Sequence, residues 1–140
     1  MSNGVANQTV PIRNIGQSVA ALAVGFVTNV ALSIGTDFGL HVMGIMPALD
    51  QPWSNAQLLG ATTYRALYGV FSSYLVARLA PLRPLEHALI GGAIGMVLGT
   101  AGAAATWTRG LGPHWYPIAL IVLALPTAWV GGKLRTAQMR

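Results

Sequence analysis

The sequence predicts an all-α integral membrane bundle of four transmembrane helices, with both ends of the chain in the cytoplasm. The 140 residues are 54% hydrophobic and only 8% charged, with a mean hydropathy of +0.57, whereas about a quarter of the residues in a soluble domain are charged. Four apolar stretches approach the length of about 20 residues that a helix needs to cross a bilayer. Helices are expected because hydrocarbon cannot satisfy free backbone N–H and C=O groups.

The pattern divides the chain into a polar N-terminal segment over 1–14, a transmembrane domain over 15–135 and a short tail over 136–140. The predicted helices cover residues 16–39, 55–78, 85–107 and 115–132. The first apolar run extends beyond the length of a signal-peptide core and lacks an obvious small-x-small cleavage site, so we expect a retained helix rather than a cleaved leader.

Helix boundaries are indicated by local signals. Ser54 with Gln57 three residues later is the arrangement of a capping box, which predicts the start of the second helix. Gly131 and Gly132 precede basic residues and predict the end of the fourth helix. Pro126 is interior to that helix and should kink it.

Charge predicts the orientation. The chain has 8 Lys+Arg and 3 Asp+Glu, a net charge of +5. With four spans, one side of the membrane receives Arg13, Arg78, Arg83, Lys133, Arg135 and Arg140, and only Arg109 flanks a span on the other. The positive-inside rule then places both termini in the cytoplasm. Because the basic residues lie at helix ends and form no single patch, we expect no nucleic-acid partner.

Motifs for catalysis are missing from the sequence. It has no cysteine, and hence no thiolate nucleophile or disulfide. It also lacks H-E-x-x-H, G-x-S-x-G and the phosphate-binding G-x-x-x-x-G-K-[ST] pattern. We therefore predict that the protein is not an enzyme.

Polar residues inside the first two helices form the most informative pattern. Four of them recur every four residues on one face of the first helix, namely Asn29, Ser33, Asp37 and His41. The second helix carries Arg65, Tyr68 and Ser72 on one face, with Tyr64 adjacent. A charge within a span is costly, by about 2.5–3.5 kcal/mol on insertion scales, and seeks a partner.

We therefore expect an ion pair between Asp37 and Arg65, with Tyr64, Tyr68 and His41 completing a polar pocket that opens outward. Three interpretations remain open. The pair could fix the register of the two helices, it could form a site for a solute, an ion or a proton, or Asp37 could sit at a solvated helix end.

Small residues predict where helices approach closely. Gly91, Gly95 and Gly99 recur every four residues on the third helix, and Ala103 extends the stripe. Gly69 and Ser73 show the same four-residue spacing of small residues, in a shorter form, on the second helix. The stripe predicts packing within the bundle or, alternatively, between subunits.

No cofactor is predicted. His41 and His114 both map to the outer side, so axial ligation of a haem, a metal or a pigment is the alternative to solvated interfacial histidines.

Several segments together resemble a group of small uncharacterised bacterial inner-membrane proteins with four predicted spans. The matching segments are Thr28–Asp37, Tyr64–Pro81, Arg83–Ile90, Gly112–Leu120 and Gly131–Arg135. The resemblance implies bacterial origin, a multi-pass location in the inner membrane and a four-helix architecture, and it brings no activity or cofactor.

Two functions are consistent with these features. The first is an accessory or structural subunit of a larger membrane assembly, which contacts the lipid bilayer, other membrane subunits or further copies of itself. The alternative is a small oligomeric transporter or channel that uses a polar pocket around Asp37 and Arg65.

Overall fold

The computed structural model describes residues 12–48 and 50–140, and over these residues it is entirely helical, without strands. Its four helices are α1 (Ile12–Val42), α2 (Asn55–Leu79), α3 (Pro84–Thr106) and α4 (Trp115–Gln138). Most of the predicted polar segment 1–14 lies outside the described residues.

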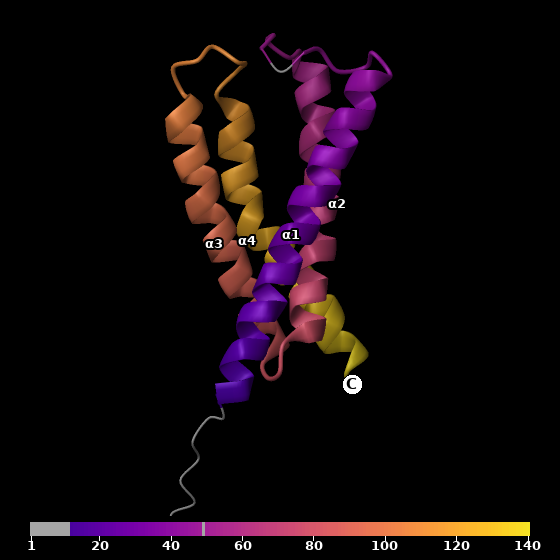
Figure 1. Cartoon of the computed structure of the whole chain (residues 1–140), viewed down its shortest axis with the longest axis vertical. Helices are drawn as coiled ribbons and strands as arrows, with labels where there is room; N and C mark the ends of the chain where they lie inside the picture. The colour runs from indigo at the N-terminus through magenta and orange to yellow at the C-terminus, as the bar shows by residue number, and fades with distance from the viewer. Residues whose placement is uncertain (1–11, 49) are drawn as a thin grey trace, which may run out of the picture.

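The helices form two hairpins joined through α2 and α4 (Figure 1). The most extensive contacts are those of α4 with α3 and with α2, and α1 packs mainly on α2. Contacts between α1 and α3 are few. The C-terminus, the start of α1 and the α2–α3 connection lie at one end of the bundle, and the other two connections lie at the opposite end (Figure 1). Towards that opposite end the hairpins diverge.

Glycines on α4 produce the closest helix contacts. A Cβ on Gly131 would overlap the Val70 carbonyl oxygen and lie 2.7 Å from the Tyr74 amide nitrogen of α2. A Cβ on Gly132 would lie 2.8 Å from Leu85 Cδ1 of α3. The prediction that these glycines end the helix is therefore wrong: the helix continues to Gln138, and the glycines bring its backbone against two neighbours at once.

The closest contact of α3 lies one residue from the predicted glycine stripe. Gly92 is the buried position, where a Cβ would lie 2.5 Å from Ala128 Cβ and 3.0 Å from the Ala124 carbonyl oxygen of α4. Gly95 has no atom within 4 Å of its Cβ position. Gly91 and Gly99 have one neighbour each at 3.4 Å, and Ala103 is buried. The stripe therefore packs at its ends and is open at its centre.

The small residues predicted on α2 do contact α4. A Cβ on Gly69 would lie 3.0 Å from Thr127 Oγ1, and Ser73 lies against Gly131. The capping box at the start of α2 is confirmed: Ser54 Oγ accepts from the Gln57 amide at 3.3 Å, and Gln57 Oε1 accepts from the Ser54 amide at 3.0 Å.

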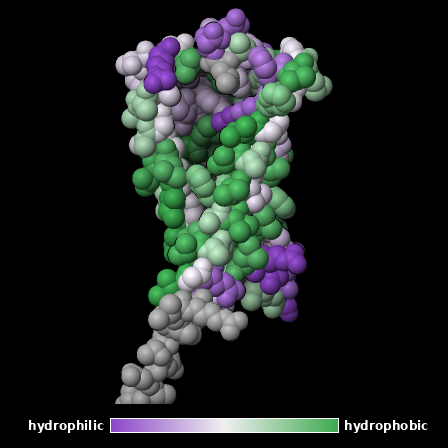
Figure 2. All heavy atoms as spheres, viewed as in Figure 1, coloured by the Kyte–Doolittle hydropathy of each residue, from purple (hydrophilic) through white to green (hydrophobic). Residues whose placement is uncertain are grey.

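Three helices are long and apolar enough to cross a membrane: α1, α3 and α4. Their outer surface is rich in hydrophobic side chains, which cover the middle of the bundle in Figure 2. The second helix does not reach the same composition, because it carries Arg65, three tyrosines and several hydroxyl residues. It packs against all three other helices, so many of these polar groups contact protein.

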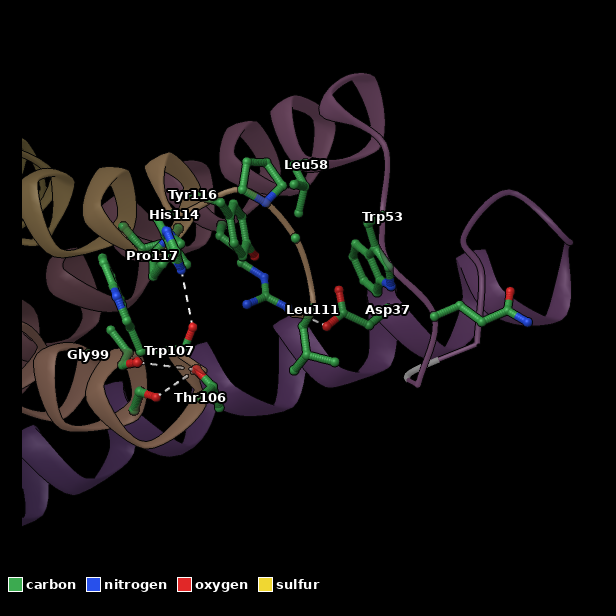
Figure 3. A pocket seen from close by; sticks show the side chains of 17 residues that line it. Asp37, Trp53, Leu58, Gly99, Thr106, Trp107, Leu111, His114, Tyr116 and Pro117 are labelled. Carbon is green, nitrogen blue, oxygen red and sulfur yellow. Dashed lines mark hydrogen bonds and ion pairs between the residues drawn. The ribbon is translucent and has the colours of Figure 1, made fainter. Parts of the chain in front are cut away.

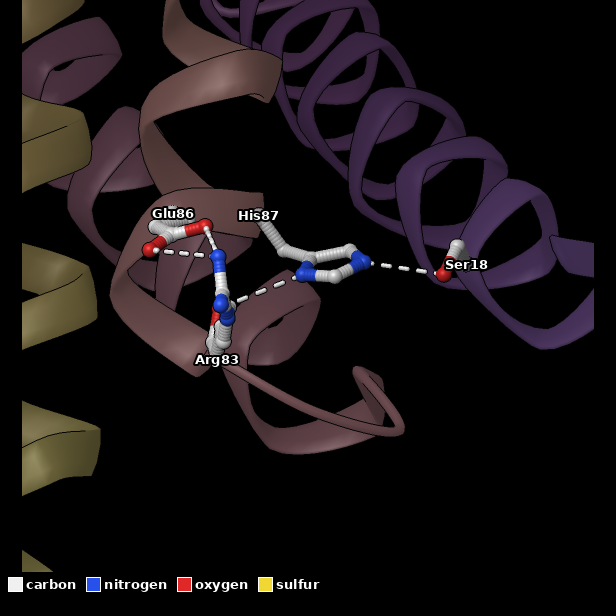
Figure 4. A network of polar contacts seen from close by, with 4 residues as sticks. All are labelled: Ser18, Arg83, Glu86 and His87. Carbon is white, nitrogen blue, oxygen red and sulfur yellow. Dashed lines mark hydrogen bonds and ion pairs between the residues drawn. The ribbon is translucent and has the colours of Figure 1, made fainter. Parts of the chain in front are cut away.

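A polar cluster ties α1 to α3 at the end of the bundle that holds the C-terminus (Figure 4). His87 Nε2 lies 2.9 Å from Ser18 Oγ, and its Nδ1 lies 3.2 Å from the Arg83 carbonyl oxygen. Ser18 Oγ also lies 2.8 Å from the Asn14 carbonyl oxygen. The His87–Ser18 bond joins α1 to α3, two helices that share few other contacts.

Candidate functional site: a cleft between the two hairpins

The diverging hairpins border a half-open cavity of about 430 Å³, which we call the hairpin cleft. One side is formed by Asp37, Gln51, Trp53, Leu58 and Arg65 of the α1–α2 hairpin. The α3–α4 hairpin contributes Gly99, Gly102, Ala103, Thr106, Trp107, Leu111, Gly112, Pro113, His114, Tyr116, Pro117 and Leu120. Figure 2 shows a hollow between the two arms in the half of the molecule where the hairpins diverge.

Asp37 and Arg65 supply the charges of the cleft. Arg65 Nη2 donates to Asp37 Oδ2, and the Tyr64 hydroxyl donates to Asp37 Oδ1. The structure thus contains the ion pair expected from the sequence. The side chains of Arg65 and Asp37 keep 27% and 20% of their exposure, and both line the cleft.

Tyr116 of α4 covers the arginine from the other hairpin. The guanidinium carbon of Arg65 lies 5.9 Å from the centroid of the Tyr116 ring, which is within cation–π range. The Tyr116 hydroxyl and Arg65 Nε are both buried and have no hydrogen-bond partner among the described residues. We call the group Asp37, Tyr64, Arg65 and Tyr116 the polar floor.

Aromatic side chains line the cleft near the loops (Figure 3). The rings of Trp107 and His114 stack, with centroids 4.0 Å apart and an interplanar angle of 7°. His114 Nε2 also lies 3.1 Å from the Trp107 carbonyl oxygen. Trp53 lies on the opposite wall, beside Asp37 in Figure 3. A ligand here would meet flat apolar surfaces beside the polar floor.

The remaining predicted pocket residues are dispersed. Tyr68 does not line the cleft, and its hydroxyl lies 2.6 Å from Thr36 Oγ1, which links α2 to α1. Ser33 makes no side-chain hydrogen bond among the described residues. His41 is exposed in the last turn of α1 and does not line the cleft, so its expected place in the pocket is wrong. Its side chain lies one turn beyond Asp37, where α1 ends.

Asn29 lines a second, smaller cavity of about 230 Å³, which we call the inner cavity. Its walls come from all four helices, and glycines 25, 69, 91, 92 and 95 contribute to them. Asn29 Oδ1 is buried without a partner among the residues described. The open centre of the α3 glycine stripe is therefore explained by this cavity.

The two histidines considered as alternative ligands of a haem, a metal or a pigment occupy different places in the fold. His114 lines the cleft and His41 does not. Within residues 12–48 and 50–140, no group of three His, Asp or Glu residues could hold a metal ion.

Sequence reasoning missed the contribution of α4 and its preceding loop. Trp53, Trp107 and Tyr116 carry the signal of membrane-interface aromatics, yet all three line the cleft. Gly102 was overlooked because it falls outside the four-residue glycine repeat. The available signal for this wall of the cleft was the clustering of aromatic residues with His114 between Trp107 and Pro117. That clustering did not indicate which way the side chains face.

The fold and the cleft define a class: a small helical bundle with three membrane-capable helices and a half-open cavity over an ion pair. Comparison of the chain with protein-family models, curated proteins and solved structures finds no match.

Proposed function

We propose that this chain is a four-span protein of a bacterial inner membrane, with both ends cytoplasmic, that binds a small molecule in the hairpin cleft and does not transform it. One observation carries the proposal: the two charges of α1 and α2 lie on the wall of a cavity of about 430 Å³. This volume lies within the range of about 300–1,000 Å³ that is typical of ligand sites.

The exposure of the ion pair favours binding over a purely structural role. A pair that only fixes helix register has no need of an adjoining cavity, since protein side chains can cover it completely. Arg65 and Asp37 instead retain 27% and 20% of their exposure on the cleft wall. We infer that a ligand can reach them.

The distribution of charge supports the orientation. Arg78, Arg83, Lys133 and Arg135 lie towards the end opposite the loops of the cleft. By the positive-inside rule that end is cytoplasmic, and the cleft then opens to the outer side. The second helix can be a span despite its composition because most of its polar side chains are buried or half-buried in the bundle.

The proposal is tested by comparing two glycine-to-leucine variants. Gly102 lines the cleft and has open space at its Cβ position, so Gly102→Leu fills the cleft. Gly60 also has open space but lines neither cavity, so Gly60→Leu is the matched control. Mass spectrometry of small molecules that co-purify in mild detergent should detect a stoichiometric ligand with the wild type and Gly60→Leu. Its absence from all three proteins, or its retention in Gly102→Leu, would contradict the proposal.

A second candidate is an accessory subunit of a membrane assembly, and a specific observation favours it. Gly35 and Gly39 on α1 have no atom within 4 Å of their Cβ positions, and their four-residue spacing suits close approach of a partner helix. If this is the function, mild-detergent purification yields a stoichiometric protein partner, and Gly35→Leu releases it.

Transport would extend the binding proposal. Towards the end that holds the C-terminus the helices pack closely, as where the backbone of Gly132 lies against Leu85 of α3. An outward-open cleft above a closed end is the arrangement of one state of a carrier. Release to the cytoplasm would require these contacts to separate.

A further inference from the structure

The polar floor has more hydrogen-bond donors than free acceptors. Tyr64 and Arg65 occupy the two oxygens of Asp37, one each. A guanidinium group has five N–H donors, and only Nη2 of Arg65 makes a hydrogen bond among the described residues. The Tyr116 hydroxyl also lacks a partner there. A ligand would therefore complement the floor with acceptor atoms.

Charge balance restricts the type of acceptor. Arg65 and Asp37 together carry no net charge, so an anionic ligand would leave an excess negative charge at low dielectric constant. A cationic ligand would have to share the Asp37 oxygens with Arg65 and Tyr64, and the positive charge of Arg65 beside it would repel it. A carbonyl or hydroxyl oxygen can accept from Arg65 without either penalty. The floor thus favours an uncharged head group that carries oxygen.

The walls of the cleft favour an apolar tail. Apart from the floor and a few polar side chains, the lining is mainly aliphatic, aromatic and glycine, including Leu58, Leu111, Leu120 and Trp107. A volume of about 430 Å³ suffices for a head group and the first part of a chain. A longer chain must leave the cleft through an opening.

Such an opening lies on the side of the bundle. The few contacts between α1 and α3 occur towards the cytoplasmic end, where His87 bonds Ser18 and Leu22 lies 3.4 Å from the Cβ position of Gly91. Beyond these contacts the two helices diverge (Figure 1), and the hollow is visible from the flank in Figure 2. In a four-span arrangement that flank faces lipid.

We propose that the ligand of the hairpin cleft is a single-chain, lipid-like molecule with an uncharged oxygen-bearing head, which enters from the outer leaflet between α1 and α3. Its head accepts hydrogen bonds from Arg65 and Tyr116, and its chain extends past α3 into the bilayer. This inference rests on the proposed binding function and specifies its ligand class.

The test uses a monoglyceride with a 9,10-dibromostearoyl chain as the probe, because bromine atoms quench tryptophan fluorescence at short range. The full chain is placed in phosphatidylcholine nanodiscs, with Trp53, Trp115 and Trp129 replaced by Phe so that Trp107 on the cleft wall reports. Dibromostearate provides the same chain with an anionic head, and Gly60→Leu and Gly102→Leu are made in this background. A melting temperature close to that of the wild type verifies the fold.

We expect saturable quenching by the monoglyceride in the parent and in Gly60→Leu, and none in Gly102→Leu. Tyr116→Phe should bind it about tenfold more weakly, since one hydrogen bond is lost. Equal or tighter binding of dibromostearate would overturn the uncharged head and leave the cleft as a binding site. Absence of saturable quenching by both probes, while a polar molecule co-purifies with the wild type and not with Gly102→Leu, would overturn the lipid class only. If no ligand co-purifies either, the binding function also fails.

Discussion

Arg65 on α2 lies beneath the ring of Tyr116 on α4, with its guanidinium carbon 5.9 Å from the ring centroid. This contact links the two hairpins at the point where they diverge. It places the aromatic ring of one hairpin over the ion pair of the other, and the cleft is the space above both.

Tyr116→Phe should separate stability from binding. The hydroxyl is buried without a partner among the described residues, and its removal abolishes an unsatisfied polar group. The melting temperature of the ligand-free protein should therefore stay unchanged or rise. Tyr68→Phe is the control, because it removes the 2.6 Å bond to Thr36 and should cost about 1 kcal/mol. A large loss of stability in Tyr116→Phe would show that its hydroxyl is bonded in the protein.

Asp37→Asn should destabilise the bundle by about 1–3 kcal/mol, because Arg65 is left without a counter-charge and part of its surface is still solvated. Replacing Arg65 by Gln in the same protein should restore part of this loss. Thermal unfolding in detergent measures both changes. Asp50→Asn is the control, since Asp50 is exposed in a loop. Equal melting temperatures of Asp37→Asn and Asp50→Asn would argue against the pair.

Gly131→Ala and Gly95→Ala should change stability in opposite directions. At Gly131 the added Cβ overlaps the backbone of α2, and we expect a loss of about 2 kcal/mol or more. At Gly95 the space is open, so the better helix propensity of alanine should gain up to about 1 kcal/mol. Unfolding in detergent compares the two. A larger loss of stability in Gly95→Ala than in Gly131→Ala would instead support the predicted stripe of Gly91, Gly95 and Gly99 as the packing surface.

Ser18→Ala should loosen the contact between α1 and α3. It removes the hydrogen bond to His87, which we expect to contribute about 1 kcal/mol. Hydrogen exchange should become faster in the first half of α1, while the rest of the bundle is unaffected. Glu86→Gln breaks only an exposed ion pair with Arg83, and should change little. Unchanged exchange in Ser18→Ala would mean that apolar contacts alone hold this end.

Much of the fold could be predicted from hydropathy and capping signals. The number of helices and the start of α2 at Ser54 follow from local rules, because each signal depends on neighbouring residues. The predicted end of α4 at residue 132 was wrong because it also relied on a local signal alone. A glycine pair before basic residues is typical of a helix end, and only the positions of α2 and α3 show that Gly131 and Gly132 are needed inside the helix.

The site was predictable only in part. Asp37 and Arg65 were identified because isolated charges in apolar helices require a partner. Tyr116 was not, since an aromatic residue at a helix start is equally suited to the membrane interface. Whether such a ring faces lipid or a cavity depends on the rotation of α4 about its axis, which is set by packing at distant positions such as Gly131.

The accessibility of a cysteine at position 102 tests the central claim most directly. The chain has no native cysteine, so Gly102→Cys places one thiol on the cleft wall. Ala104→Cys places a thiol at almost the same depth on the exposed, opposite face of α3. A membrane-impermeant thiol reagent added to the outer side of intact spheroplasts should label Gly102→Cys rapidly and leave Ala104→Cys unlabelled. Equal labelling of the two positions, or labelling of Ala104→Cys alone, would contradict an outward-open cleft within the membrane.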